Sequence, residues 1–140
     1  KNYVLAVLSA GNGKGFQPVH VQKLFFLIDR ELKDLIGKQY FHFEPYDYGP
    51  FDKELYSVLD CLEEKGLVEV ARTPNLSKRE YRLTVSGQKK GVEVFTRLDP
   101  KVRKGIMILT DFVLKQPFAK LVAAIYKKYP EMKVNSIFAC

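Results

Sequence analysis

Residues 52–98 restrict the fold most, because they combine a strong helix pattern with two breaks in regular structure. Apolar side chains recur at three- and four-residue spacing through residues 55–62, which is typical of an amphipathic helix with one buried face. The carboxylate of Asp52 can accept the free N–H groups of the first turn. Gly66 suits the left-handed C-terminal stop. The pattern therefore predicts a helix over 52–65.

A β-hairpin is predicted directly after this helix. Residues 67–72 have the alternation of a strand, residues 73–78 contain proline and asparagine, and residues 80–84 return as a second strand. Two strand patterns around a polar turn indicate an antiparallel pair. Ser86 is then expected to cap a further helix that runs to about residue 98.

Further helix patterns flank this segment. They cover residues 3–10, 18–37, 102–113 and 121–129. Three helices, a hairpin and further helices are the element order of a winged helix-turn-helix. We therefore expect an α+β fold, mostly α, with a β-hairpin wing. The chain 1–140 is interpreted as one domain with a winged-helix core at 1–98 and a C-terminal helical extension at 99–140.

An aromatic segment, residues 40–51, separates the second helix from the third. Six of its twelve residues carry aromatic rings. The alternation of Phe41 and Phe43 predicts a short strand, while Gly49 and two prolines exclude a continuing helix. The rings need a surface to pack on. They either fill the core of this domain or form a binding surface, and the sequence leaves both readings open.

The charge pattern gives mixed evidence about nucleic acid. In winged-helix proteins the helix before the wing enters the major groove, yet residues 52–65 carry two basic and five acidic side chains. Carboxylates repel phosphates, which weakens this reading. The wing region 72–90 carries a local charge of +5, and residues 101–140 have eight basic against two acidic side chains, within a total of +7. Such charge suits nucleic acid or an acidic protein, or serves solubility alone.

Composition and spacing argue against catalysis. His20, His42 and Cys61 form no metal-binding or nucleophilic motif, so no catalytic, metal or cofactor site is predicted. The two cysteines are too few for a disulfide scaffold and indicate a reducing, cytoplasmic setting. No apolar run approaches the roughly 18 residues that span a bilayer, so no membrane partner is expected.

Several segments resemble a known family. They are Gln22-Lys-Leu-Phe-Phe-Leu-Ile-Asp29, Phe43-Glu-Pro-Tyr-Asp-Tyr-Gly-Pro-Phe51, Leu55-Tyr56, Gly66-Leu-Val68, Tyr81-Arg-Leu-Thr84 and Lys128-Tyr-Pro130 with Ser136. Together they look like the SocA-like, or Panacea-domain, antitoxin family, many members of which are phage-associated. The family often has serine where this chain has Asp52, and both residues can cap a helix. The resemblance implies a small protein that neutralises a toxin or adapts it for degradation.

Two functions remain, besides a purely structural role in a larger complex. The first is a non-enzymatic, antitoxin-like protein that binds a partner toxin. Its candidate anchors are Tyr46, Tyr48, Phe51 and Tyr56, with Arg79 and Arg82 as rim charges. The second is a DNA-binding transcriptional regulator that acts on double-stranded DNA, as a homodimer through the C-terminal helices. Its candidate contacts are Lys53, Ser57, Lys78, Arg79 and Arg82.

Overall fold

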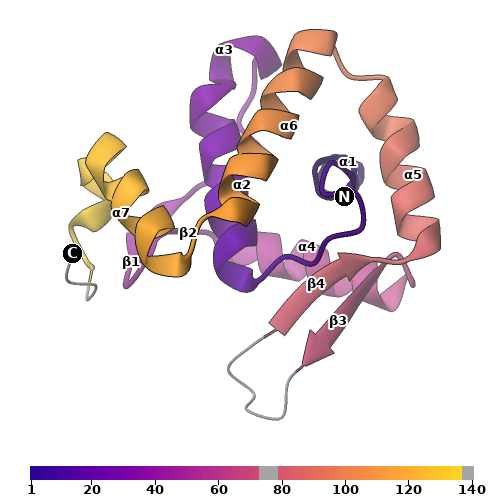
Figure 1. The fold of residues 1–140 in the computed structure, drawn as a ribbon, viewed down its shortest axis with the longest axis horizontal. Coiled ribbons are helices and arrows are strands. Elements are labelled where there is room, and N and C mark those ends of the chain that lie inside the picture. The colour runs from indigo at the N-terminus through magenta and orange to yellow at the C-terminus, as the bar shows by residue number, and fades with distance from the viewer. Residues whose placement is uncertain (73–78, 137–140) are drawn as a thin grey trace.

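The computed structural model describes residues 1–72 and 79–136, and this part of the chain is mostly helical with two small antiparallel β-hairpins (Figure 1). The mostly helical α+β class is thereby confirmed. The elements in chain order are α1 (Asn2–Ser9), α2 (Pro18–Glu31), α3 (Lys33–Ile36), β1 (Glu44–Tyr46), β2 (Gly49–Phe51), α4 (Lys53–Glu64), β3 (Val68–Arg72), β4 (Arg79–Leu83), α5 (Val85–Thr96), α6 (Pro100–Lys115), α7 (Phe118–Lys128) and the 3-10 turn η1 (Pro130–Lys133).

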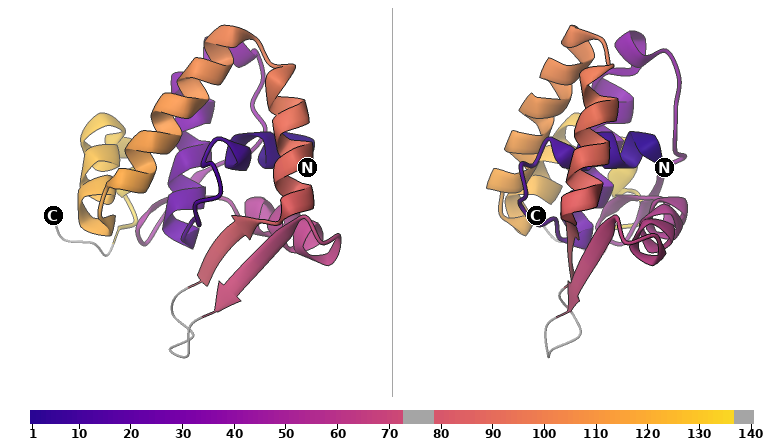
Figure 2. Two further views of the ribbon diagram at one scale, coloured as in Figure 1. Left: turned by 45° about the vertical axis from the view of Figure 1, so that its right-hand side comes forward. Right: turned by 90° about the vertical axis from the view of Figure 1, so that its right-hand side faces the viewer.

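Helix α1 lies in the middle of the molecule, with α2 on one side and α5 on the other (Figures 1 and 2). Its consecutive side chains from Val4 to Leu8 are all buried. A helix that is apolar on every side is stable only when other elements surround it. This explains why so short a helix is central to the fold.

Two glycines allow α5 to pack closely against its neighbours. A Cβ atom on Gly91 would lie 2.5 Å from the carbonyl oxygen of Leu5 in α1, and one on Gly87 would lie 1.9 Å from that of Leu67. Both distances are shorter than any ordinary carbon–oxygen contact. Since the clashing atoms are backbone, a larger residue at either position would have to move a whole element.

The first hairpin corrects the strand predicted at Phe41 and Phe43. The paired strands are β1 and β2, with Tyr46 opposite Gly49 across a two-residue turn. Gly49 has φ = +100°, a conformation that glycine adopts without strain. Phe41 and Phe43 precede the ladder, and both rings are buried in the core. Their alternation therefore reflects burial of two rings rather than strand pairing.

Two helix boundaries also differ from the predictions. The helix expected over 18–37 is interrupted at Leu32, which leaves the helical conformation, and the chain resumes as α3 before Gly37. The cap of α5 is Thr84 rather than Ser86. The Thr84 hydroxyl accepts a hydrogen bond from the Gly87 N–H at 3.0 Å and donates one to the Gly66 carbonyl oxygen, in the turn after α4, at 2.8 Å.

The second hairpin, β3–β4, extends away from the helices in every view (Figures 1 and 2). Val68 pairs with Leu83 at its base and Arg72 with Arg79 at its far end. The predicted hairpin is confirmed, while its predicted turn, residues 73–78, lies outside the described residues. A bridge of two backbone hydrogen bonds between Phe16 and Tyr81 attaches β4 to the loop before α2.

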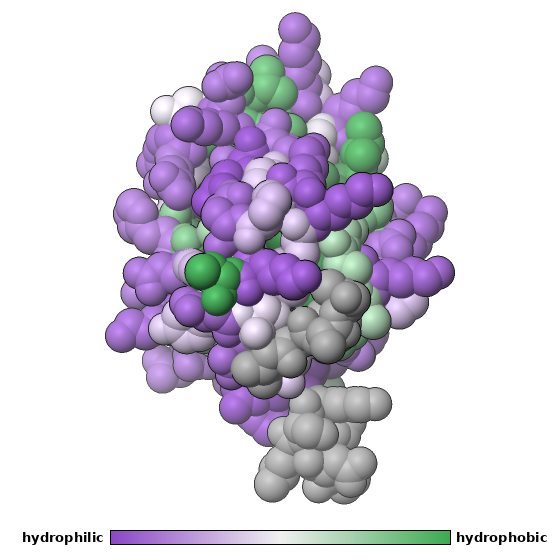
Figure 3. All heavy atoms as spheres, turned by 90° about the vertical axis from the view of Figure 1, so that its left-hand side faces the viewer, coloured by the Kyte–Doolittle hydropathy of each residue, from purple (hydrophilic) through white to green (hydrophobic). Residues whose placement is uncertain are grey.

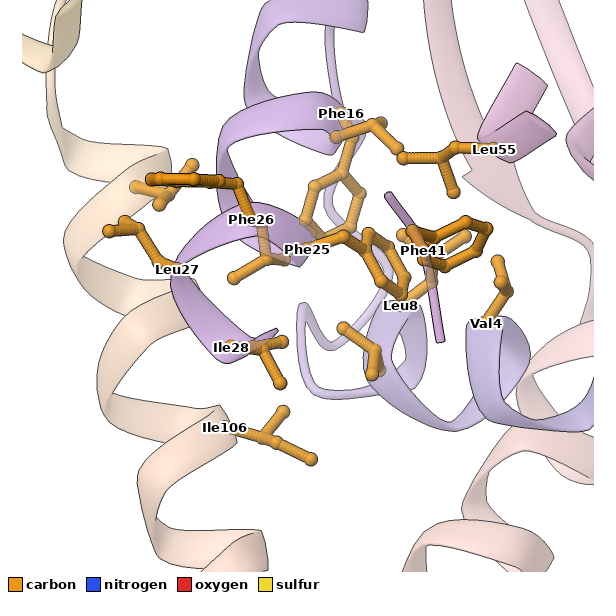
Figure 4. Packing of buried hydrophobic residues seen from close by; sticks show 14 of the residues in the cluster. Val4, Leu8, Phe16, Phe25, Phe26, Leu27, Ile28, Phe41, Leu55 and Ile106 are labelled. Carbon is orange, nitrogen blue, oxygen red and sulfur yellow. The ribbon is translucent and has the colours of Figure 1, made fainter. Parts of the chain in front are cut away.

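The core is continuous from α1 to α7. Figure 4 shows Phe25 and Ile28 of α2 between Phe41 on one side and Ile106 of α6 on the other. Buried side chains of α7 belong to the same cluster. Polar contacts also join the end of α7 to α2, because Glu31 accepts hydrogen bonds from both Lys128 and Tyr129.

Candidate partner-binding groove

An open groove of about 330 Å³ lies between the β1–β2 hairpin, the start of α2, the first turns of α4 and the start of α7. It is lined by Pro18, Val19, Gln22, Lys23, Tyr46, Asp47, Tyr48, Gly49, Phe51, Tyr56 and Phe118. Figure 3 shows the side of the molecule that carries α7 and the β1–β2 hairpin, where pale and green side chains lie scattered among hydrophilic ones. The lining residues include all four candidate anchors, Tyr46, Tyr48, Phe51 and Tyr56.

Three of the anchors, Tyr46, Phe51 and Tyr56, form a row of ring contacts that continues to Tyr81. Tyr46 stacks on Phe51 with ring centroids 4.7 Å apart, Phe51 meets Tyr56 edge-on at 5.5 Å, and Tyr56 is 6.4 Å from Tyr81. Tyr48 packs edge-on against a ring at the start of α7. Such offset and edge-on geometries are those that aromatic pairs prefer.

The four anchors differ in exposure. Tyr46 and Tyr48 are 49% and 44% exposed, whereas Phe51 and Tyr56 are half-buried. Burial raises the pKa of Tyr56 to about 12, so its hydroxyl stays protonated near neutral pH. The aromatic segment is thus divided: Phe41 and Phe43 fill the core, while its tyrosines at 46 and 48 face solvent.

Gln22 holds the segment that joins the groove to α4. Its side chain is 2% exposed, and it donates to the Asp52 carbonyl oxygen at 3.0 Å while accepting from the Asp52 N–H at 2.9 Å. The carboxylate of Asp52 in turn accepts from the N–H groups of Glu54 and His42. The predicted cap is confirmed, and the same residue also fixes the approach to β1.

Lys23 is the buried charge of the groove. Its side chain is only 5% exposed, and its Nζ donates to the Pro50 carbonyl oxygen at 3.3 Å. Burial lowers the pKa of Lys23 to about 8, because an ammonium group loses hydration in an apolar surrounding. Lys23 was not among the residues predicted for a site, since in the sequence it looks like any surface lysine of an amphipathic helix.

The segment after α7 supports the turn of the first hairpin. The Ser136 hydroxyl accepts from the Tyr126 hydroxyl at 2.6 Å and donates to the Asp47 carbonyl oxygen at 3.1 Å. Asn135 donates to the Pro45 carbonyl oxygen at 3.1 Å. The bonds to Pro45 and Asp47 join residues about ninety positions apart. Of these residues only Ser136 was noted from the sequence outside the aromatic segment, as part of the family resemblance.

The two candidate rim arginines lie on opposite faces of β4, because positions 79 and 82 differ by an odd number and successive strand residues alternate. Arg79 shares its face with Tyr81 and is close enough to Tyr56 to influence the pKa of that phenol. Arg82 is on the other face, in an exposed ion pair with Glu80. Only Arg79 therefore lies beside the aromatic row.

The candidate DNA contacts are dispersed. Lys53 and Ser57 are exposed on α4, and the outward side of that helix also carries exposed Asp60 and Glu64. Arg72 of the hairpin forms an exposed ion pair with Glu63 at 3.7 Å. Lys78 lies outside the described residues.

The residues considered for chemistry lie on separate elements. His20, half-buried in the first turn of α2, accepts a hydrogen bond from the Gln17 N–H at 3.3 Å, His42 is exposed before β1, and Cys61 is half-buried in α4. Across residues 1–72 and 79–136, no three His, Cys, Asp or Glu side chains come together as metal ligands. The same residues contain no helix with the length and apolar character needed to cross a bilayer.

Compared with known proteins, the sequence matches no family model and no curated relative. The likeness to the SocA-like family and the winged-helix interpretation therefore stay predictions.

Proposed function

We propose that this protein is a non-enzymatic, antitoxin-like binding protein that holds a partner toxin through the aromatic groove. The observation that carries the proposal is the convergence of Tyr46, Tyr48, Phe51 and Tyr56 on one open groove. Aromatic side chains are enriched among the residues that contribute most to protein–protein binding. A cytoplasmic location belongs to the proposal on the basis of the low cysteine content.

The groove has the rigidity that such an interface needs. The Gln22–Asp52 hydrogen bonds hold one wall, and the Ser136–Asp47 hydrogen bond supports the turn that carries the exposed tyrosines. Binding then orders few additional side chains, so less conformational entropy is lost on association. A tyrosine has few rotatable bonds and covers a large area, which adds to this advantage.

The winged-helix interpretation belongs to the same proposal. Four helices (α1 to α4) precede the β3–β4 hairpin, and α3 is a single short turn directly after α2. The hairpin extends from the helical body as a wing would (Figure 1). In this arrangement α4 is the counterpart of a recognition helix. The proposed toxin contact combines the first turns of α4 with the aromatic segment before it.

Double-stranded DNA is the second candidate partner, because the extended hairpin carries exposed Arg79 and Arg82. Two features weigh against it. Exposed carboxylates line the outward side of α4, and the arginines at 72 and 82 already have carboxylate partners. A phosphate contact by Arg72 or Arg82 would have to replace one of these ion pairs, so we propose the protein partner first.

A homodimer through the C-terminal helices remains part of the proposal. Met107, Ile108 and Phe112 of α6 are 54%, 58% and 39% exposed, which is unusual for large apolar side chains on one helix. If α6 pairs with a second copy, light scattering should give twice the mass of the chain. Ile108→Glu should then return the protein to a monomer, whereas a monomeric wild type would exclude this dimer.

The proposal is tested by capture from an extract of the source organism on the immobilised full chain, with nuclease present throughout. Tyr48→Ala is compared with Tyr40→Ala, which removes a ring of similar exposure, 40%, that is stacked on Tyr3 and does not line the groove. We expect one protein to be retained by the wild type and by Tyr40→Ala. Its affinity for Tyr48→Ala should be about thirtyfold lower, the effect of losing an anchor worth about 2 kcal/mol.

The captured protein is then expressed alone and together with the binding protein. Growth arrest that is relieved only by the wild type and Tyr40→Ala would support an antitoxin role. The result against the proposal is retention that disappears with nuclease, depends steeply on salt and is lost in Arg79→Glu/Arg82→Glu. That outcome identifies a DNA-binding regulator.

A further inference from the structure

Lys23 carries a charge that no described residue neutralises in an ion pair. No ion pair joins it to a carboxylate within residues 1–72 and 79–136. An ammonium group has three donors, and the structure assigns one of them, to the Pro50 carbonyl oxygen. Burial of an ammonium group with so few partners is costly, and such groups in proteins are normally paired.

The position of Lys23 makes this charge available to a ligand. The residue lines the same groove as Tyr46, Tyr48 and Phe51. Those rings reduce the access of water, so an electrostatic contact with Nζ is stronger there than at the open surface. A group that enters the groove would therefore meet mostly apolar and aromatic walls, the exposed side chain of Asp47 at the hairpin turn, and one buried cation with unused donors.

We infer that the groove receives an acidic side chain, Glu or Asp, from an apolar segment of the partner protein, and that its carboxylate accepts hydrogen bonds from the Nζ of Lys23. This inference rests on the proposed function, since it names the chemistry of the partner at the same groove. The methylene groups of a Glu side chain can pack on the rings while its carboxylate reaches the buried ammonium. A phosphate, with its larger charge, would lack a second cation among the residues that line the groove.

A side chain suits the groove better than the terminal carboxylate of a chain. A terminal carboxylate is attached directly to backbone, so it would bring an amide N–H against apolar rings, where an unpaired polar group is costly. A side-chain carboxylate leaves the partner's backbone outside, in contact with water. The partner segment is therefore expected to contain Glu or Asp beside an aliphatic or aromatic residue.

The test uses a displayed library of short random segments, each held at both ends inside a carrier protein so that none offers a chain terminus. Selection is performed on the full chain as wild type, Lys23→Met and Lys90→Met. Met keeps most of the buried stem of Lys23, while Lys90 is exposed on α5 and its replacement controls for net charge. Segments that fail to bind Tyr48→Ala are taken as groove-dependent.

We expect groove-dependent segments selected by the wild type and by Lys90→Met to share an acidic residue at one position. Lys23→Met should select segments without it. A synthetic version of one segment should bind the wild type at least about tenfold more tightly than its Glu→Gln form, because a hydrogen bond to a charged group is worth about 1.5–3 kcal/mol. This last comparison needs no variant of the protein, so it holds even if Lys23→Met does not fold.

Titration adds an independent check. With a pKa of about 8 for free Lys23, its charged fraction falls about tenfold from one pH unit below that value to one unit above it. The affinity for the acidic segment should fall by the same factor, and that for its Gln form should not change. The inference is wrong if groove-dependent segments show no acidic position, if the Glu and Gln forms bind equally, or if only free chain ends bind. A groove-dependent toxin could still exist in each of these cases, so the proposed function would be judged separately.

Discussion

Replacing Gln22 by Leu should destabilise the protein although it improves the local sequence for a helix. Leucine has a similar volume and at least equal helix propensity, so neither a cavity nor a weaker helix is expected. The change removes both hydrogen bonds between the Gln22 amide and the backbone of Asp52. A typical hydrogen bond contributes about 1 kcal/mol to stability, and leaving a buried group unpaired costs about 1–3 kcal/mol. Asp52 is half-buried, so water can replace part of the loss.

We therefore expect the free energy of unfolding to fall by about 2 kcal/mol, twice the value of one hydrogen bond. The measurement is denaturant unfolding followed by circular dichroism, with the slope against denaturant concentration checked for constancy. Gln39→Leu makes the same substitution at an exposed position and serves as the control. If Gln22→Leu stays within about 0.5 kcal/mol of the wild type, as surface changes do, the backbone of Asp52 does not depend on Gln22. The reasoning about the rigidity of the groove would then be refuted.

Three further results are expected. Gly91→Ala should lower the melting temperature despite a helix-propensity gain of about 1 kcal/mol, because its new Cβ meets backbone. Gly105→Ala should cost less, because there the Cβ meets a leucine side chain that can move. Thr84→Ala should cost about 1 kcal/mol in denaturant unfolding and Ser86→Ala almost nothing, since the threonine is the cap. Burial raises the pKa of Asp29 to about 6 in the folded protein, so folding favours the protonated carboxyl group. The free energy of unfolding should therefore be highest below the ordinary pKa of an aspartate and should fall as pH rises through about 6. Asp29→Asn should remove that loss in melting curves across this pH window, and an unchanged pH profile would contradict the assignment.

Helices and hairpins could be predicted because their signals are local. Three local signals predicted α4: the spacing of apolar residues in 55–62, the capping oxygen of Asp52 and the left-handed stop at Gly66. Each signal depends on residues within one or two helical turns. Those elements agree with the structure to within one or two residues. The predictions failed where two local signals competed. Thr84 and Ser86 are both good caps, and only the position of α5 against its neighbours selects between them.

The aromatic segment marks the limit of local reasoning. Alternation made Phe41 and Phe43 look like a strand, because a strand and an extended segment that buries every second ring have the same period. The sequence identified the rings at 46, 48 and 51 as candidate anchors. It could not separate them from the buried pair, since burial depends on elements elsewhere in the chain.

The sequence by itself determined the class of the fold, the order of its main helices and of the second hairpin, and the chemical character of the candidate site. Tertiary structure alone decided which rings reach solvent and that Arg79 and Arg82 face opposite ways. It decided that Lys23 is buried with no carboxylate partner in the described part of the chain. It also decided that Gln22 holds Asp52 from thirty positions away. The physical reason is that periodicity and capping act over a few residues, whereas burial and long-range hydrogen bonds depend on which distant segments are brought together when the core forms.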